Sequence, residues 1–153
     1  MKIRLFSLVL TAMMLVSCGR TVDWAPVNLY VRVCDSEGND LLDPARDNSW
    51  LEGTVMVWSG GEELLQLTPP TRTYMPDFTG FRLEGGYSDG YRLVFGELNG
   101  EKQYRNEQFI IRWPDSTEDV ITLTRRLNYI TIDAKTVWRL NGEKTDSPIV
   151  IVK

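Results

Sequence analysis

The sequence contains no histidine and only two cysteines, Cys18 and Cys34. Imidazole is therefore unavailable within this chain as a general base, a zinc ligand or the axial ligand of a haem. A Ser-His-Asp triad and a Cys-His pair are excluded for the same reason. The composition leaves a pair of carboxylates as the general acid–base device for a hydrolase.

Only one long apolar run occurs, and it opens the sequence. Lys2 and Arg4 precede it, residues 5–16 are nearly all apolar, and Ser17 stands directly before Cys18. A charged start, an apolar stretch and a small residue are typical of a secretory signal peptide. No other run approaches the roughly 20 apolar residues that a membrane-spanning helix needs.

The end of this run, Leu15-Val16-Ser17-Cys18, resembles the lipobox of bacterial lipoproteins. The resemblance implies that residues 1–17 are a signal peptide that is removed and that Cys18 is acylated, with chains such as palmitate. Residues 18–26 would form a lipidated tether in which Trp24 rests at the bilayer interface or docks on the domain. Residues 27–153 have the usual length of a single domain. Cys34 would be left unpaired, so an intrachain disulfide is excluded.

The charge balance is acidic, with a net charge of −4 for the whole sequence. A nucleic-acid partner is not expected, because phosphate binding needs a basic surface. Electrostatic adhesion to a membrane is not expected either. The acyl chains on Cys18 would hold the protein at the membrane without charge, at about 0.8 kcal/mol per buried methylene.

Alternating apolar and polar residues after the tether predict an all-β domain. The alternation is clearest in residues 27–34, where four valines and leucines share one face. The other predicted strands are residues 54–58, 62–67, 79–84, 91–98, 101–113, 120–124, 127–133, 135–140 and 147–152. Short strands at this spacing favour an antiparallel β-sandwich, with an immunoglobulin-like Greek key as the first choice and a small β-barrel as the alternative.

Three glycine-containing segments predict hairpin turns. Ser59-Gly60-Gly61 is expected to join strands 54–58 and 62–67. Asn99-Gly100 and Asn141-Gly142 each predict a type I′ turn with two residues at positive φ. They would join 91–98 to 101–113 and 135–140 to 147–152. Gly100→Val should then cost more stability than Gly96→Val if Gly96 lies in an ordinary extended conformation with room for a side chain. Phe109, Ile111 and Trp113 would then share one face and lie in the core.

The acidic segment from Asp35 to Asp43 has oxygen-bearing side chains spaced somewhat like a calcium loop. Its glycine, Gly38, falls at the fourth position instead of the sixth, and Arg46 stands where a glutamate would be needed. Turn chemistry explains the same residues. We therefore expect a turn, no metal and no cofactor.

The stretch Gly38 to Pro44, Gly-x-Asp-Leu-Leu-Asp-Pro, follows a lipobox, a tether and one strand. This order resembles uncharacterised small envelope lipoproteins of the Bacteroidetes, which implies an all-β envelope domain of unknown activity. Surface-exposed lipoproteins of that group tend to carry acidic residues directly after the cysteine, whereas this chain has Gly19-Arg20-Thr21. The expected location is the outer membrane facing the periplasm, with surface exposure as the alternative.

Aromatic residues in the connections suggest a function. Trp50, Tyr74 and Tyr87 lie between predicted strands, where a sandwich usually carries recognition. They predict a non-catalytic binding or structural module for a protein or glycan partner, unless the rings pack against their own domain.

The alternative is a carboxylate-dependent glycoside hydrolase or other hydrolase. Its candidate acids form two clusters, which are Asp115, Glu118 and Asp119, and Asp35, Glu37, Asp40 and Asp43. Acids clustered in turns are usually solvated, which favours the non-enzymatic hypothesis.

Overall fold

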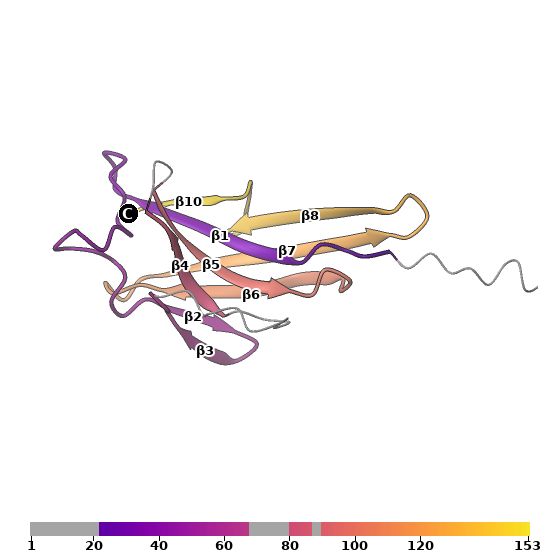
Figure 1. Cartoon of the computed structure of the whole chain (residues 1–153), viewed down its shortest axis with the longest axis horizontal. Helices are drawn as coiled ribbons and strands as arrows, with labels where there is room; N and C mark the ends of the chain where they lie inside the picture. Colours follow the sequence, from indigo (N-terminus) through magenta and orange to yellow (C-terminus); the bar gives the residue numbers. More distant parts are fainter. Residues whose placement is uncertain (1–21, 68–79, 87–89) are drawn as a thin grey trace, which may run out of the picture.

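The computed structural model describes residues 22–67, 80–86 and 90–153, which form two β-sheets packed face to face with no helix among them (Figure 1). The smaller sheet has the order β10-β1-β5-β4. Its strands are β1 (Val27–Cys34), β4 (Phe81–Gly85), β5 (Tyr91–Leu98) and β10 (Ile149–Val152). Neighbouring strands are antiparallel except for β1 and β10, which are parallel.

The larger sheet is antiparallel throughout and has the order β3-β2-β6-β7-β8-β9. Its strands are β2 (Val55–Trp58), β3 (Gly61–Leu64), β6 (Tyr104–Arg112), β7 (Glu118–Asn128), β8 (Asp133–Leu140) and β9 (Glu143–Thr145). The prediction of an all-β sandwich is confirmed, and the barrel alternative is wrong because the strands divide into two separate sheets. The two sheets have four and six strands, whereas the two sheets of an immunoglobulin constant-type domain have four and three.

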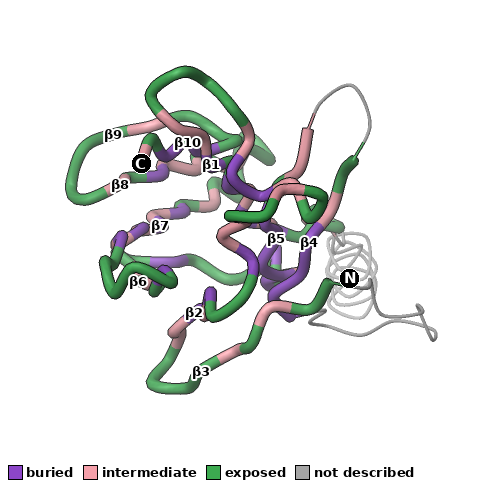
Figure 2. The backbone as a smooth tube through the Cα atoms, turned by 90° about the vertical axis from the view of Figure 1, so that its left-hand side faces the viewer, coloured by how far each residue is buried: buried purple, intermediate pink, exposed green. Residues whose placement is uncertain are grey.

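The core fills the space between the two sheets, where the buried segments of Figure 2 face one another. The inward side chains of β1 alternate with polar ones as predicted. Phe109, Ile111 and Trp113 are buried on the opposing side, which confirms their predicted place in the core. Phe109 of β6 meets Phe95 of β5 across the layers, with ring centroids 5.6 Å apart.

Two of the predicted hairpin turns are present. Ser59 and Gly60, with φ of 50° and 78°, join β2 to β3, and Asn141 and Gly142, with φ of 50° and 92°, join β8 to β9. The second turn leads to a different strand from the one expected. Asn141-Gly142 pairs β8 with the short strand β9, whereas β10 crosses to the other sheet and lies beside β1.

The predicted hairpin at Asn99-Gly100 is wrong. The segment connects β5 in the smaller sheet to β6 in the larger one, and neither residue has a positive φ. Gly100 is required for another reason, because a Cβ there would overlap the backbone carbonyl oxygens of Trp24 and Ala25. The tether therefore runs directly over this connection.

The expectation for Gly96 is also wrong. Gly96 has a φ of 126° and lies in a β-bulge opposite Asn28, where the register between β1 and β5 shifts. A Cβ would lie 2.9 Å from the carbonyl oxygen of Val27. A side chain at this position would be strained both by its backbone conformation and by lack of space.

The predicted strands 120–124 and 127–133 are a single strand, β7, that ends at Asn128. Arg125 continues this strand, is buried on its inward face and donates to Thr136 Oγ1 at 3.0 Å. The turn falls instead at residues 129–132, between β7 and β8.

A matched pair of glycines tests the contact between the tether and the domain. Gly142 has a positive φ but open space around it, so Gly142→Ala should cost about 1 kcal/mol for conformation alone. Gly100→Ala should cost about 2 kcal/mol, because backbone atoms of residues 24 and 25 must move. Urea denaturation compares the two variants. Equal costs would show that the tether does not lie over Gly100.

Candidate functional site

The sandwich has two ends of different character. The N-terminal end consists of the tether residues 22–26, the β5–β6 connection and the β7–β8 turn, which lie together on the right of Figure 1. The distal end consists of the loop between β1 and β2, residues 35–54, and the C-terminus on the left. A partner that binds at the distal end would stand away from the tether.

The distal end carries a shallow, open depression of about 470 Å³. Its apolar walls come from the loop before β2 and from the end of β3, and they include Pro44, Leu51, Leu64, Leu65 and Leu67. The side chains of Leu64 and Leu67 are 73% and 57% exposed. These two exposed leucines make the rim of the depression apolar.

Local backbone pairing holds this rim in place. Gln66 leaves the larger sheet and pairs with the smaller one, donating from its amide to Phe81 O and accepting from Leu83 N, each at 2.9 Å. Leu65, which precedes Gln66 in the chain, packs against the core. Leu67, which follows Gln66, is exposed.

Of the three predicted aromatic binding residues, the structure describes one. Trp50 is half-buried and its ring centroid lies 5.9 Å from that of Trp113, so it packs against its own domain. Its backbone amide donates to Leu41 O at 2.9 Å. Tyr74 and Tyr87 lie outside the described residues, as does Cys18.

Asp119 is the centre of a buried polar cluster near Trp50. Its carboxylate accepts from Trp113 Nε1 at 2.7 Å, from Asn141 Nδ2 at 2.8 Å and from Lys153 Nζ at 2.7 Å. Burial alone would raise the pKa of Asp119, but the hydrogen bonds from these three donors outweigh it and lower the pKa. The cluster ties the C-terminal residue to β7, and sequence reasoning missed it because Lys153 is distant along the chain.

The other candidate carboxylates of that group have structural partners. Glu118 accepts from Arg112 Nε at 2.8 Å, and Asp115 accepts from Thr117 Oγ1 at 2.7 Å. The hydrogen bond from Thr117 lowers the pKa of Asp115. A glycosidase acid needs a raised pKa, whereas the pKa of Asp115 is lowered.

The acidic loop after β1 has the hydrogen bonds of a turn. Asp35 Oδ1 accepts from the backbone amides of Glu37 at 2.9 Å and Asn39 at 2.8 Å. Its Oδ2 accepts from Asn39 Nδ2, and this bond lowers the pKa of Asp35. Within the described ranges, no group of three acidic or cysteine side chains could hold a metal ion. The turn interpretation therefore accounts for these oxygens.

The N-terminal end presents a second exposed apolar feature that the sequence did not reveal, because residues 127–133 were expected to be a strand. The β7–β8 turn carries Tyr129, Ile130 and Ile132, all exposed. Trp24 of the tether meets Tyr129 edge to face, with ring centroids 6.1 Å apart. Trp24 is therefore docked on the domain, one of the two alternatives expected for it.

Comparison with protein-family models, curated proteins and solved structures found no match to this chain. Among the described residues, no helix has the length and apolar character required to cross a membrane. What the structure itself defines is a single β-sandwich with a leucine-rimmed depression at one end and a docked tether at the other.

Proposed function

We propose that this protein is a lipid-anchored, non-catalytic binding module of the bacterial cell envelope that holds a protein partner at its distal end. The observation that carries the proposal is the leucine-rimmed depression, which is lined largely by the loop of residues 35–54. That loop lies at the end of the sandwich opposite the tether (Figure 1). A domain attached through the tether would present this depression away from the membrane. The proposed location is the outer membrane facing the periplasm.

A protein partner is favoured over a glycan by the chemistry of the rim. Leu64 and Leu67 are aliphatic and expose most of their side chains, which suits burial against apolar side chains of another protein. A glycan would bind better to an exposed aromatic ring, on which a sugar can pack. The ring of Trp50 packs on Trp113 instead. Arg46 and Glu52 at the edge of the depression provide both charge signs for polar contacts around it.

The anchor is tested by the variant Cys18→Ala in the full-length chain. We expect the parent protein to partition into the detergent phase and the variant to be lost from it, because the acyl chains supply the membrane affinity. Cys34→Ser is the matched control and should partition like the parent. If Cys18→Ala and the parent partition alike, the lipid anchor is not at Cys18.

The binding site is tested by placing a photo-reactive amino acid at Leu64 and, as a control, at Val150. Val150 is also an exposed aliphatic residue, but it lies on β10 in the other sheet. We expect a specific protein adduct in native envelopes from position 64 and none from position 150. The substitution Leu67→Asp should abolish that adduct. Equal adducts from both positions would contradict a partner site at the depression.

A further inference from the structure

We propose that the β7–β8 tip, residues 129–132, inserts into the phospholipid headgroup layer beside the lipid anchor and orients the domain on the membrane. The inference rests on the proposed lipid anchor at Cys18. It adds a second membrane contact, which is made by the protein itself and is separate from the acyl chains.

The tip exposes three large apolar side chains to solvent. Tyr129 is 60% exposed, Ile130 is 94% exposed and Ile132 is 42% exposed. Aliphatic side chains gain by leaving water, and a tyrosine suits the membrane interface because its ring is apolar and its hydroxyl stays hydrated. The composition of the tip therefore fits the boundary between headgroups and acyl chains.

The backbone of the tip is unfavourable for the residues that it carries. Ile132 has a φ of 53°, a region that β-branched residues resist and that glycine or asparagine would accept. Asn128 fixes the turn by accepting from the amides of Ile130 at 3.0 Å and Thr131 at 3.2 Å. Strain of this kind at an exposed position indicates a role for the side chain outside the fold.

The tether limits how far this tip can lie from the lipid. Trp24 packs on Tyr129 and lies only six positions after Cys18 in the sequence. Six extended residues span about 20 Å at most, so an acylated Cys18 holds the tip within that distance of the bilayer. The partner most accessible to the tip is therefore the membrane itself.

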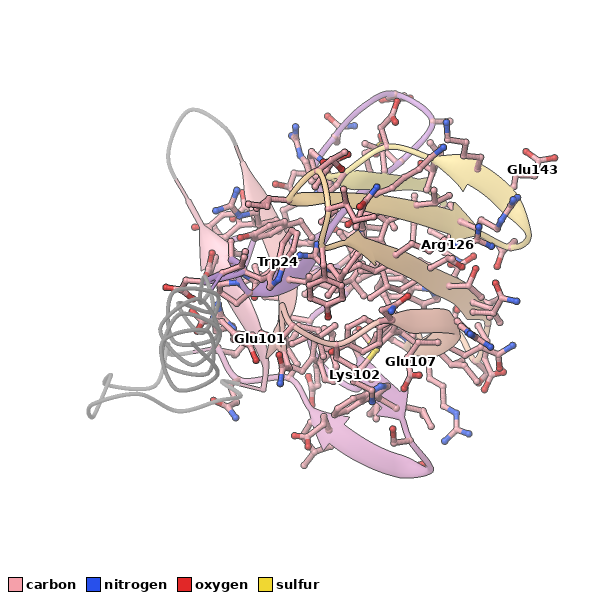
Figure 3. The ribbon with its side chains drawn as sticks, turned by 90° about the vertical axis from the view of Figure 1, so that its right-hand side faces the viewer. Trp24, Glu101, Lys102, Glu107, Arg126 and Glu143 are labelled. Carbon is pink, nitrogen blue, oxygen red and sulfur yellow. The ribbon has the colours of Figure 1, made fainter. Side chains whose placement is uncertain are left out.

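Two cations flank the tip in the sequence, one on each of the two strands that it joins. Arg126 of β7 and Lys135 of β8 are exposed and directly opposite one another in the register. Figure 3, which views the molecule from the side on which the β7–β8 turn lies in Figure 1, labels Arg126 and Trp24. Like charges facing each other across strands repel, and phosphate groups would neutralise them. Asp133 is the single acid of residues 126–135.

The test uses the full-length lipidated chain with Cys34→Ser, reconstituted into vesicles of phosphatidylethanolamine and phosphatidylglycerol. An environment-sensitive fluorophore is attached at Thr131→Cys or, as a distal control, at Ser36→Cys. We expect the chain to float with the vesicles. Spin-labelled lipids should quench the label at position 131 and not at position 36. Adding Ile130→Asp should reduce quenching at 131 to the level at 36, while flotation is retained.

The outcomes separate the two proposals. A chain that floats but shows no more quenching at 131 than at 36 overturns tip insertion and leaves the anchor intact. Energy transfer between labelled copies without quenching overturns it as well, because the tip would then be covered by a second copy. A chain that does not float overturns the lipid anchor and the tip contact together.

Discussion

Replacing Phe109 with alanine is expected to lower the free energy of unfolding by about 3–5 kcal/mol, the usual cost of emptying an aromatic site in a core. Phe109 is fully buried and its ring lies 5.6 Å from Phe95 of the other sheet, 6.2 Å from Trp58 and 6.2 Å from Trp138. The cavity would therefore open between the two layers, where large rings from both sheets cannot easily close it.

Ile110→Ala is the matched control, because Ile110 is the next residue of β6, points to the other face of the sheet and is only half-buried. Equilibrium urea denaturation measures both variants. The core assignment would be contradicted if Ile110→Ala were as costly as Phe109→Ala.

The second large effect concerns Asp119. Asp119→Ala should cost about 3–4 kcal/mol at neutral pH, because it leaves the ammonium group of Lys153 and the polar groups of Trp113 and Asn141 without their buried acceptor. Glu118→Gln is the control. Its partner Arg112 and the carboxylate itself are both exposed, so this variant should leave stability nearly unchanged.

The same carboxylate should make stability depend on pH. The folded protein lowers the pKa of Asp119 below its unfolded value of about 3.9. The stabilisation is therefore fully present above about pH 4 and is lost as the pH falls through the folded pKa. The difference in unfolding free energy between the parent and Asp119→Ala should shrink below pH 4. A difference that stays constant down to pH 2 would show that the ionised carboxylate is not what holds the cluster.

The two apolar features that carry the proposals could not be located from sequence, and the reasons are physical. Leu64 and Leu67 were expected inside one strand from 62 to 67, but β3 ends at Leu64 and Gln66 pairs with the other sheet. Tyr129 to Ile132 were expected inside a strand because β-branched and aromatic residues favour strands. An exposed turn made of such residues goes against their local preference.

The sequence by itself determined the class of fold, the absence of histidine chemistry and the faces of the clearest strands. Period-two alternation sends every second side chain of β1 and of residues 109–112 in β6 to one face, and that face can be stable only if it is buried. Asn141-Gly142 determined a turn because its two residues accept positive φ locally.

Only the tertiary structure decided which strands are neighbours. Asn99-Gly100 has the same letters as Asn141-Gly142, yet it crosses between sheets because β5 pairs with β1 and β4 while β6 pairs with β2 and β7. The contacts of Lys153 with Asp119 and of Trp24 with Tyr129 join residues far apart in the chain. Such contacts depend on the packing of whole layers, which local sequence patterns do not encode.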